Sequence, residues 1–274
     1  MEPTLEYVDR GTDRLALHVY SRESTDPAVL FLPAMGVPAR YYRPFATALA
    51  EHGLAVTVAD LRGNGASTPI PGRRTRYGYA ELTADVGALV ERLDGRPVVL
   101  AGHSLGGQLA MLHTAVHRPP NVVGLALIAV GVPYWREGYG ARRGFGLLGF
   151  SLWSAATAAV VGYWPGWGFG GRQARGVLSD WAYTARTGRF RPVHGTDAER
   201  ALRELTTPVL ALSMAGDDLT PAPVIDFTAA KMSAAPLERE HFDEARAGVP
   251  VDHMRWARAG TAIPARVAEF AKSR

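Results

Sequence analysis

The sequence contains no cysteine among its 274 residues. This absence excludes disulfide bonds, thiolate nucleophiles and cysteine-ligated metal sites. Lysine is nearly absent as well, because the 30 basic residues comprise 28 arginines and only Lys231 and Lys272. With a formal net charge of +4, this imbalance indicates a compositional bias of the whole chain rather than a surface for an acidic partner.

The basic residues form no pattern that is typical of nucleic-acid binding. Their densest cluster, Arg73, Arg74 and Arg76, follows a Pro-Gly pair, which indicates a solvated loop. No basic helix with interleaved aromatic residues is present, so we expect no nucleic-acid partner. The first residues, MEPTLEYVDRG, have neither the basic nor the apolar region of a secretory signal, which predicts a cytoplasmic location. The sequence leaves the oligomeric state open.

Most of the chain alternates between strand and helix patterns. An opening hairpin is expected within residues 5–20, and continuous apolar runs predict buried strands at 29–32, 96–101 and 122–130. Further strands are expected at 54–60, 208–212 and 237–242. Helical spacing occurs at 41–51, 80–93, 105–117 and 263–272. The alternation predicts an α/β fold with a mostly parallel sheet flanked by helices on both faces. It is interrupted only between the strands ending near 130 and starting near 208. We therefore expect a core domain of residues 1–132 and 201–274, with a helical cap inserted at 133–200.

The strand at 96–101 leads directly into Gly102-His103-Ser104-Leu105-Gly106 and then a helix. A G-x-S-x-G sequence between a buried strand and a helix is typical of a nucleophile on a strained turn, with the next backbone N–H helping to hold an oxyanion. Ser104 is therefore the expected nucleophile and Leu105 the expected N–H donor. The alternative, a glycine-rich turn with an incidental serine, has less support because both flanking elements are in place.

A serine nucleophile needs a base and an orienting carboxylate, and in this arrangement the chain order is Ser, acid, His. Asp217 follows the strand at 208–212 and is the expected acid, with Asp218 as the alternative. The competing structural interpretation is that Asp218 or Thr220 caps the helix that follows. His253 lies in a loop after the last strand and is the expected base, whereas His241 lies within that strand.

A second oxyanion donor is expected in the turn after the strand at 29–32. The N–H of Met35 is the preferred candidate and that of Ala34 the alternative. Pro33-Ala34-Met35-Gly36 forms this turn.

Together, the stretches LPAMG, DLRGNGAS and GHSLGG and the late Asp and His resemble the α/β-hydrolase superfamily. The resemblance covers nearly the whole chain and is strongest to uncharacterised bacterial predicted hydrolases related to serine-aminopeptidase-like and lipase-like members. It implies a Ser-His-Asp triad of Ser104, His253 and Asp217 and no cofactor. Two departures are Gly216 in place of a first Asp and Pro33-Ala34 in place of the common His-Gly.

Residues 144–171 form a run without a charged side chain, and this run is long enough for a membrane-spanning helix. A single crossing would place Ser104 on one side of the membrane and Asp217 and His253 on the other, so we expect no integral membrane span. The run instead predicts an apolar cap, and reversible contact of that cap with membranes is an open possibility. Its aromatic side chains are expected to contact a hydrophobic substrate, and the predicted substrate-binding residues are Trp135, Trp153, Trp164 and Trp167.

Two further motifs have less support. Gly144–Gly149 matches G-x-G-x-x-G but follows Ala-Arg-Arg rather than a strand, which is not typical of dinucleotide binding. His113 and His117 are four residues apart on a predicted helix, but no third ligand is evident, so we expect no metal.

The sequence therefore predicts an esterase-like or lipase-like serine hydrolase that cleaves a small hydrophobic acyl or aromatic ester. A thioesterase, acyltransferase or C–C hydrolase with the same triad is the nearer alternative. A non-catalytic ligand-binding protein of this fold is the more distant one.

Overall fold

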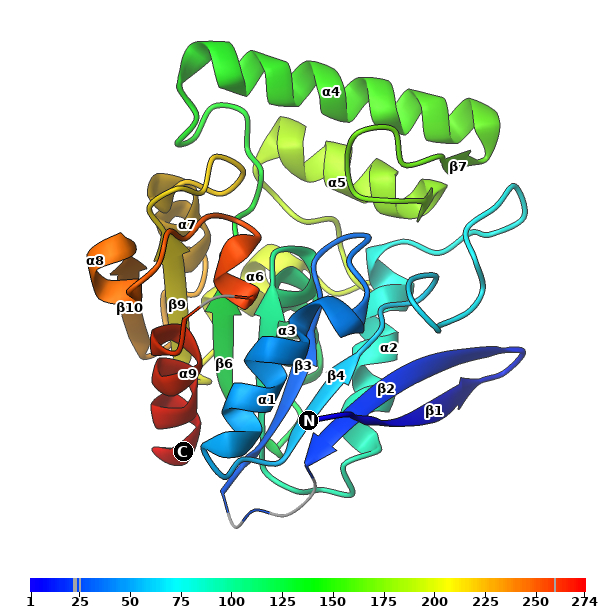
Figure 1. The fold of residues 1–274 in the computed structure, drawn as a ribbon. Helices are drawn as coiled ribbons and strands as arrows, with labels where there is room; N and C mark the ends of the chain where they lie inside the picture. The colour runs from blue at the N-terminus through cyan, green and yellow to red at the C-terminus, as the bar shows by residue number, and fades with distance from the viewer. Residues whose placement is uncertain (22–23, 25, 259) are drawn as a thin grey trace.

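The computed structural model describes residues 1–21, 24, 26–258 and 260–274 (Figure 1). In these residues one large sheet has the strand order β1-β2-β4-β3-β5-β6-β9-β10. Its strands are β1 (Thr4–Arg10), β2 (Asp13–Ser21), β3 (Ala28–Leu32), β4 (Val56–Ala59), β5 (Val98–His103), β6 (Val122–Ile128), β9 (Val209–Met214) and β10 (Leu237–Phe242). The opening hairpin, β1 and β2, is antiparallel and joins β4 in antiparallel register, whereas all other neighbours are parallel. The predicted α/β fold with a mostly parallel sheet is confirmed.

Helices cover both faces of this sheet. The helices outside the insertion are α1 (Arg43–Glu51), α2 (Tyr79–Glu91), α3 (Leu105–His117), α7 (Ala222–Ala229), α8 (Glu244–Ala247) and α9 (Ala262–Lys272), with short 3₁₀ turns at η1 (Ala39–Tyr42) and η2 (Arg255–Ala257). Alternate residues of each central strand enter different cores: Val98 and Leu100 pack with α2 and α3, and Val99 and Ala101 pack with α1 and α9. The continuous apolar runs of the sequence arise because these strands are buried on both faces.

The predicted helix at 41–51 is divided into two pieces. Residues 39–42 form the 3₁₀ turn η1, and α1 begins at Arg43 with Pro44 in its first turn. Proline is tolerated there because the first N–H groups of a helix have no partner within the helix.

The insertion between β6 and β9 contains α4 (Gly140–Val161), α5 (Arg175–Thr187), α6 (Ala198–Arg203) and a small hairpin of β7 (Tyr163–Trp164) and β8 (Gln173–Ala174). Figure 1 shows α4 and α5 stacked above the carboxyl ends of the parallel strands. The helical insertion is therefore confirmed. Its limits at 133 and 200 stay a prediction, and the second of them falls inside α6, which packs against α3 of the core.

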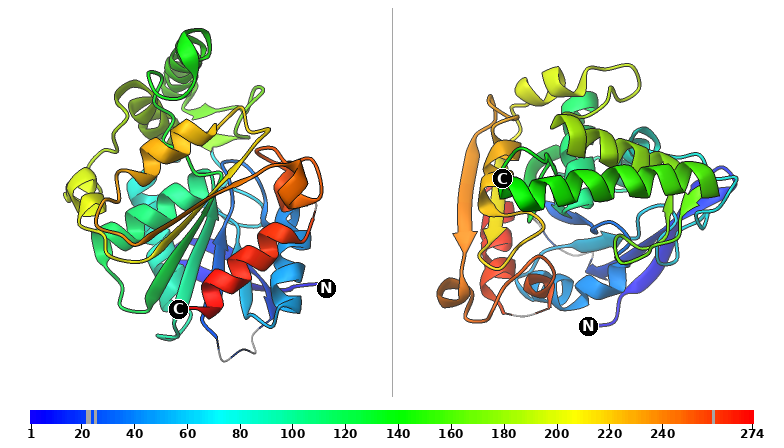
Figure 2. Two further views of the ribbon diagram at one scale, coloured as in Figure 1. Left: turned by 90° about the vertical axis from the view of Figure 1, so that its left-hand side faces the viewer. Right: turned by 90° about the horizontal axis from the view of Figure 1, so that it is seen from above.

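Helix α4 spans most of the uncharged run. Among the described residues it is the one helix that is long and apolar enough to cross a membrane, judged by length and composition alone. It packs along α5 on top of the cap (Figures 1 and 2). The G-x-G-x-x-G match at 144–149 lies inside this helix rather than in a loop after a strand.

Candidate active site

Ser104 occupies the turn between β5 and α3. Its backbone φ of +50° and ψ of −118° lie in a region that a residue with a side chain rarely adopts. The turn is possible because its neighbours are glycines: a Cβ on Gly106 would lie 2.1 Å from the carbonyl oxygen of Leu32, and one on Gly107 would lie 2.2 Å from Val130. The sequence therefore fixes a sharp strand-to-helix turn with a serine at its tip.

Asp217 and His253 form a buried pair close to this turn. Nδ1 of His253 lies 2.8 Å from Oδ2 of Asp217. The same Oδ2 accepts a hydrogen bond of 2.6 Å from the hydroxyl of Thr220, and Oδ1 accepts from the backbone N–H groups of Leu219 and Thr220. These bonds hold the carboxylate in one orientation, with one oxygen facing the imidazole.

The surroundings of Asp217 favour its ionised form. Burial alone would raise the pKa of this carboxyl, but the hydrogen bond and charge of His253, together with the bonds from Thr220, outweigh that effect and lower the pKa. An ionised carboxylate at Nδ1 keeps the other ring nitrogen, Nε2, as the one that can accept a proton.

The two alternatives left open by the sequence, Asp218 and His241, have other partners. The exposed carboxylate of Asp218 accepts a 2.6 Å hydrogen bond from Arg143 of the cap, and the ring of His241 pairs with Ser213 on the neighbouring strand β9. The helix-capping interpretation of Asp218 or Thr220 is wrong, because α7 begins after Pro221 and has no side-chain cap.

A cavity of about 390 Å³ lies between the carboxyl edge of the sheet and the cap. Ser104 and His253 both line it. Its other lining residues are Gln108, Gly131, Pro133, Tyr139, Arg143, Gly146, Leu147, Phe150, Phe169, Trp181, Asp218, Leu219 and Thr220. Most of this wall is apolar or aromatic, which is typical of a site for a small organic ligand.

The four tryptophans predicted to contact substrate are not among the described residues that line this cavity, so their contact with substrate stays a prediction. Trp164 is fully buried inside the cap, where its ring packs against those of Trp153 and Trp167, and Trp135 packs against Phe145. Trp153 and Trp167 lie on the outer surface of the cap, where they are 48% and 56% exposed, so their rings are on the side away from the cavity.

The aromatic wall of the cavity comes instead from Tyr139, Phe150, Phe169 and Trp181. Leu147 and Phe150, three residues apart on α4, both face this cavity.

The oxyanion donors expected from the sequence are the N–H of Leu105 and that of Met35 or Ala34. The N–H of Leu105 is in the first turn of α3, where helical N–H groups have no partner within the helix. The N–H of Ala34 donates to the hydroxyl of Tyr42. The N–H of Met35, in contrast, makes no hydrogen bond among the described residues. This difference favours Met35 over Ala34 as the second donor. The Met35 side chain lies against Gly170 of the cap.

A network that the sequence did not reveal links this turn to the serine and the imidazole. The Tyr42 hydroxyl that accepts from Ala34 lies 2.8 Å from Nδ1 of His103, the residue before Ser104. The rings of His103 and His253 have centroids 4.6 Å apart. Burial, followed by the charge of His253, holds the pKa of His103 well below its usual range, so His103 is neutral. Nothing in the local sequence indicates a contact between positions 61 residues apart.

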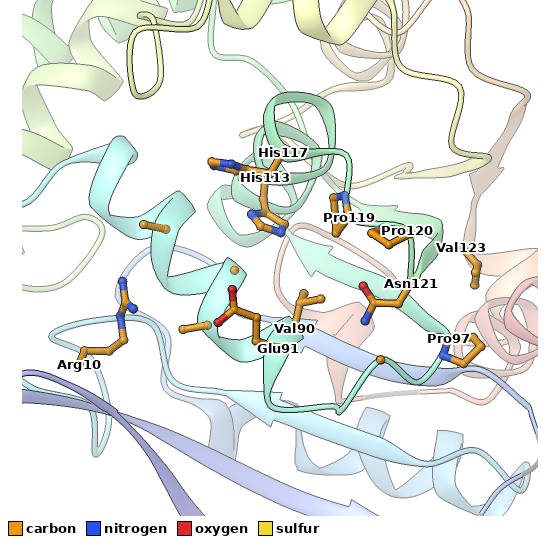
Figure 3. Close-up of a pocket in the computed structure, with 14 residues that line it drawn as sticks. Arg10, Val90, Glu91, Pro97, His113, His117, Pro119, Pro120, Asn121 and Val123 are labelled. Carbon is orange, nitrogen blue, oxygen red and sulfur yellow. The ribbon is translucent and has the colours of Figure 1, made fainter.

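A second, larger cavity of about 910 Å³ lies at the opposite end of β5, where Pro97 precedes the strand (Figure 3). His113 and His117 of α3 line it, with ring centroids 5.1 Å apart. Burial, with a smaller effect of the charge of His117, lowers the pKa of His113 to about 4. Within the described ranges, no group of three or more His, Asp or Glu side chains is arranged to hold a metal ion.

The parallel sheet with its short antiparallel start, the serine turn after β5 and the cap inserted after β6 define a protein of the α/β-hydrolase class. A family model described as "alpha/beta hydrolase fold" matches residues 27–234. The chain belongs to this family.

Comparison with individual proteins gives partial matches in sequence and full matches in fold. The chain is 34% identical over 128 residues to protein phosphatase methylesterase 1 of Mus musculus, covering 45% of this chain and 32% of that protein. It is 30% identical over 117 residues to the sn-1-specific diacylglycerol lipase ABHD11 of Mus musculus, covering 42% and 36%. The chain thus spans about a third of the length of these relatives. Alpha/beta hydrolase domain-containing protein 10 from mouse has a similar fold, with a TM-score of 0.66 at 19% identity over 97% and 96% of the two chains.

Proposed function

We propose that this protein is a serine hydrolase that cleaves a hydrophobic carboxylic ester through an acyl-enzyme. The observation that carries the proposal is the buried 2.8 Å pair of His253 and Asp217, together with the cavity that both His253 and Ser104 line. The two sequence relatives are a methylesterase and a lipase, which supports an ester as the substrate.

In the proposed reaction the Ser104 hydroxyl attacks the ester carbonyl while Nε2 of His253 takes its proton. The resulting imidazolium is stabilised by the Asp217 carboxylate, which stays ionised. The tetrahedral intermediate then collapses: the bond to the alkoxy group breaks, His253 gives its proton to the leaving alcohol, and the acyl group remains on Ser104. Water repeats the sequence in the second half, releasing the carboxylic acid and restoring the serine.

The negative charge that develops on the carbonyl oxygen needs fixed donors. The N–H groups of Leu105 and Met35 take this role in the proposal, because the first is at the start of α3 and the second makes no other recorded hydrogen bond among the described residues. Stabilisation by such preorganised dipoles is worth several kcal/mol, and loss of one donor costs roughly 10²–10³ in kcat.

The apolar wall of the cavity supports a hydrophobic acyl or aromatic group in the substrate. Phe150, Phe169 and Trp181 supply most of its aromatic surface, and Leu147 adds an aliphatic side chain. A pocket of this kind orients a ligand by its few polar groups and binds it by burial of apolar surface.

The test is hydrolysis of p-nitrophenyl esters with acyl chains of two to twelve carbons by the wild-type protein and by Ser104→Ala. We expect activity that rises from the shortest chain to a medium chain and is lost in the variant. Activity that is greatest for acetate and falls steadily with chain length contradicts the hydrophobic substrate. Activity that survives in Ser104→Ala contradicts the acyl-enzyme. Product analysis with added alcohol or amine acceptors, and a matched thioester, separates hydrolysis from transfer and from thioesterase activity.

A further inference from the structure

Helix α4 places four of its large apolar side chains on the outside of the molecule. Its fully buried residues are small or polar, namely Gly144, Ser151, Ser154 and Ala158. Its outer face carries Phe145, Leu152, Trp153 and Val160, with exposed fractions of 61%, 44%, 48% and 89%. The surface helix of a soluble protein shows the opposite distribution, with apolar residues inward and polar residues outward.

The same apolar surface continues beyond the helix. Trp167 is 56% exposed and its ring lies 6.1 Å from that of Trp153. Between Arg143 and Arg172 no side chain carries a charge. Viewed from above, α4 extends across the outermost layer of the cap, on the side away from the sheet (Figures 1 and 2). An exposed apolar surface of this extent marks a site of interaction with another apolar phase or molecule.

Unpaired basic residues lie at both ends of this surface. Arg142 is exposed at the start of α4, and Gly162 at its end packs against Arg73 of the 70–76 loop, which also carries the exposed Arg74. In the part of the chain that the structure describes, none of these three arginines forms an ion pair. Ile70, 71% exposed, adds an apolar side chain to the same loop.

We propose that the outer face of α4, together with Trp167 and the 70–76 loop, is a docking surface for an anionic lipid bilayer. The helix lies in the plane of the interface, with Phe145, Trp153 and Val160 inserted and the flanking arginines against the lipid phosphates. It does not need to leave the protein, because its other side remains packed along α5.

The charge distribution argues against a second copy of the chain as the occupant. Helix α4 contains no acidic residue, and arginines flank both of its ends. Pairing two such helices, in parallel or antiparallel, brings arginines of one copy against arginines of the other. An anionic membrane complements both the apolar face and the basic ends.

Docking by this face brings the membrane next to the candidate active site. Leu147 and Phe150 project from the inner side of the same helix into the cavity that holds Ser104. The interface and the cavity are therefore separated by the width of one helix, and a lipid-derived or membrane-dissolved molecule has a short path between them.

The proposal is tested by vesicle flotation of the Ser104→Ala protein, which retains the docking surface and excludes effects of turnover. The probes are vesicles of phosphatidylcholine alone and of phosphatidylcholine with 30% phosphatidylglycerol. We expect flotation with the anionic vesicles, weakened by high salt. The double variant Phe145→Ser/Val160→Ser should reduce the partition coefficient at least about tenfold. The matched control, Leu5→Ser/Leu237→Ser, removes two leucines that are 46% and 45% exposed elsewhere and should leave binding unchanged.

Three outcomes overturn the proposal. The first is that the folded protein floats with neither kind of vesicle. The second is that both double variants lose vesicle binding to the same extent. The third is a dimer that forms without lipid as the protein concentration rises and that the Phe145→Ser/Val160→Ser variant abolishes. The last result identifies a second copy as the occupant. Neither binding nor its absence depends on catalysis, so this outcome and that of the ester assays are independent.

Discussion

Oδ2 of Asp217 lies 2.8 Å from Nδ1 of His253, whereas the carboxylate of the very next residue, Asp218, extends outward to Arg143. Two adjacent acids of the same chemistry therefore occupy different environments, one buried against an imidazole and one exposed. This difference assigns them separate roles in the proposed mechanism and makes them a matched pair for mutagenesis.

Replacing the buried acid tests its role in orienting the imidazole. Asp217→Asn keeps the shape of the side chain but removes its charge and lets the imidazole adopt the wrong tautomer, so we expect kcat for ester hydrolysis to fall by roughly 10⁴. Asp218→Asn breaks an exposed ion pair with Arg143 at the cavity wall but leaves the partner of the imidazole in place, so kcat should change less than about twofold, with any larger effect confined to KM. Steady-state kinetics on both variants, with circular dichroism to verify folding, makes the comparison. Equal effects of the two substitutions would contradict the assignment.

The serine turn depends on a glycine that no other residue can replace. A Cβ at Gly106 would lie 2.1 Å from the Leu32 carbonyl oxygen, so Gly106→Ala must displace β3 or α3. We expect this variant to lose several kcal/mol of unfolding free energy, on the order of the cost of overpacking a core. Gly149→Ala, in α4 with no atom within 4 Å of its added Cβ, is the control and should stabilise the protein by up to about 1 kcal/mol. Urea denaturation of both measures the contrast.

The Tyr42 hydroxyl is expected to contribute to both stability and activity. Tyr42→Phe leaves the buried N–H of Ala34 and Nδ1 of His103 without their partner, which costs about 1–3 kcal/mol. Because Ala34 precedes Met35, we also expect a lower kcat with a smaller change in KM. Tyr20→Phe is the control, since the buried hydroxyl of Tyr20 has no hydrogen-bond partner among the described residues. A Tyr42→Phe protein as stable and active as Tyr20→Phe would show that the network has no positioning role.

The buried histidine of the second cavity predicts a pH dependence of stability. The pKa of His113 is lowered from 6.5 to about 4 in the folded protein. Between pH 6.5 and pH 4 this imidazole is therefore protonated in the unfolded chain but neutral in the folded protein. Stability is therefore complete above pH 6.5 and falls as the pH drops through this window. From pH 7.5 to 5.5 we expect His113 to account for a loss of about 1 kcal/mol. Guanidinium denaturation at both pH values measures it, and His113→Leu should flatten the dependence. An unchanged slope in the variant would rule out this source.

The cavity wall predicts which aromatic residues control chain-length preference. Phe150→Ala enlarges the cavity beside Ser104 and should shift the best acyl chain to a longer one. Trp167→Ala removes a larger ring that does not line the cavity and should leave the preference unchanged. The measured quantity is the ratio of kcat/KM between two chain lengths in soluble substrates, which does not depend on the amount of folded protein. A shift in Trp167→Ala without one in Phe150→Ala would place the substrate elsewhere.

The sheet and the serine turn could be predicted because their signals are local. Apolar runs at β3, β5 and β6 require burial on both faces, and the glycines around Ser104 permit a conformation that few sequences permit. The preference for Asp217 and His253 also had a local basis, since each follows a strand that ends at the same edge of the sheet.

The rest depends on contacts between distant residues. The hydrogen bond between Tyr42 and His103 joins positions 61 apart, and no periodicity indicates it. The cap was recognised from its uncharged run, but with apolar side chains all around α4, composition could not tell which side faces inward. The sequence therefore did not single out Phe150, Phe169 and Trp181 as the aromatic residues that line the cavity.

The central claim is an activated serine at position 104, and labelling with a fluorophosphonate probe followed by intact-mass analysis tests it most directly. Wild-type protein should take up one probe per chain. Ser104→Ala and His253→Ala should take up none, whereas His241→Ala should be labelled like the wild type. A folded wild-type protein that remains unlabelled, or a Ser104→Ala protein that is labelled, would contradict the account.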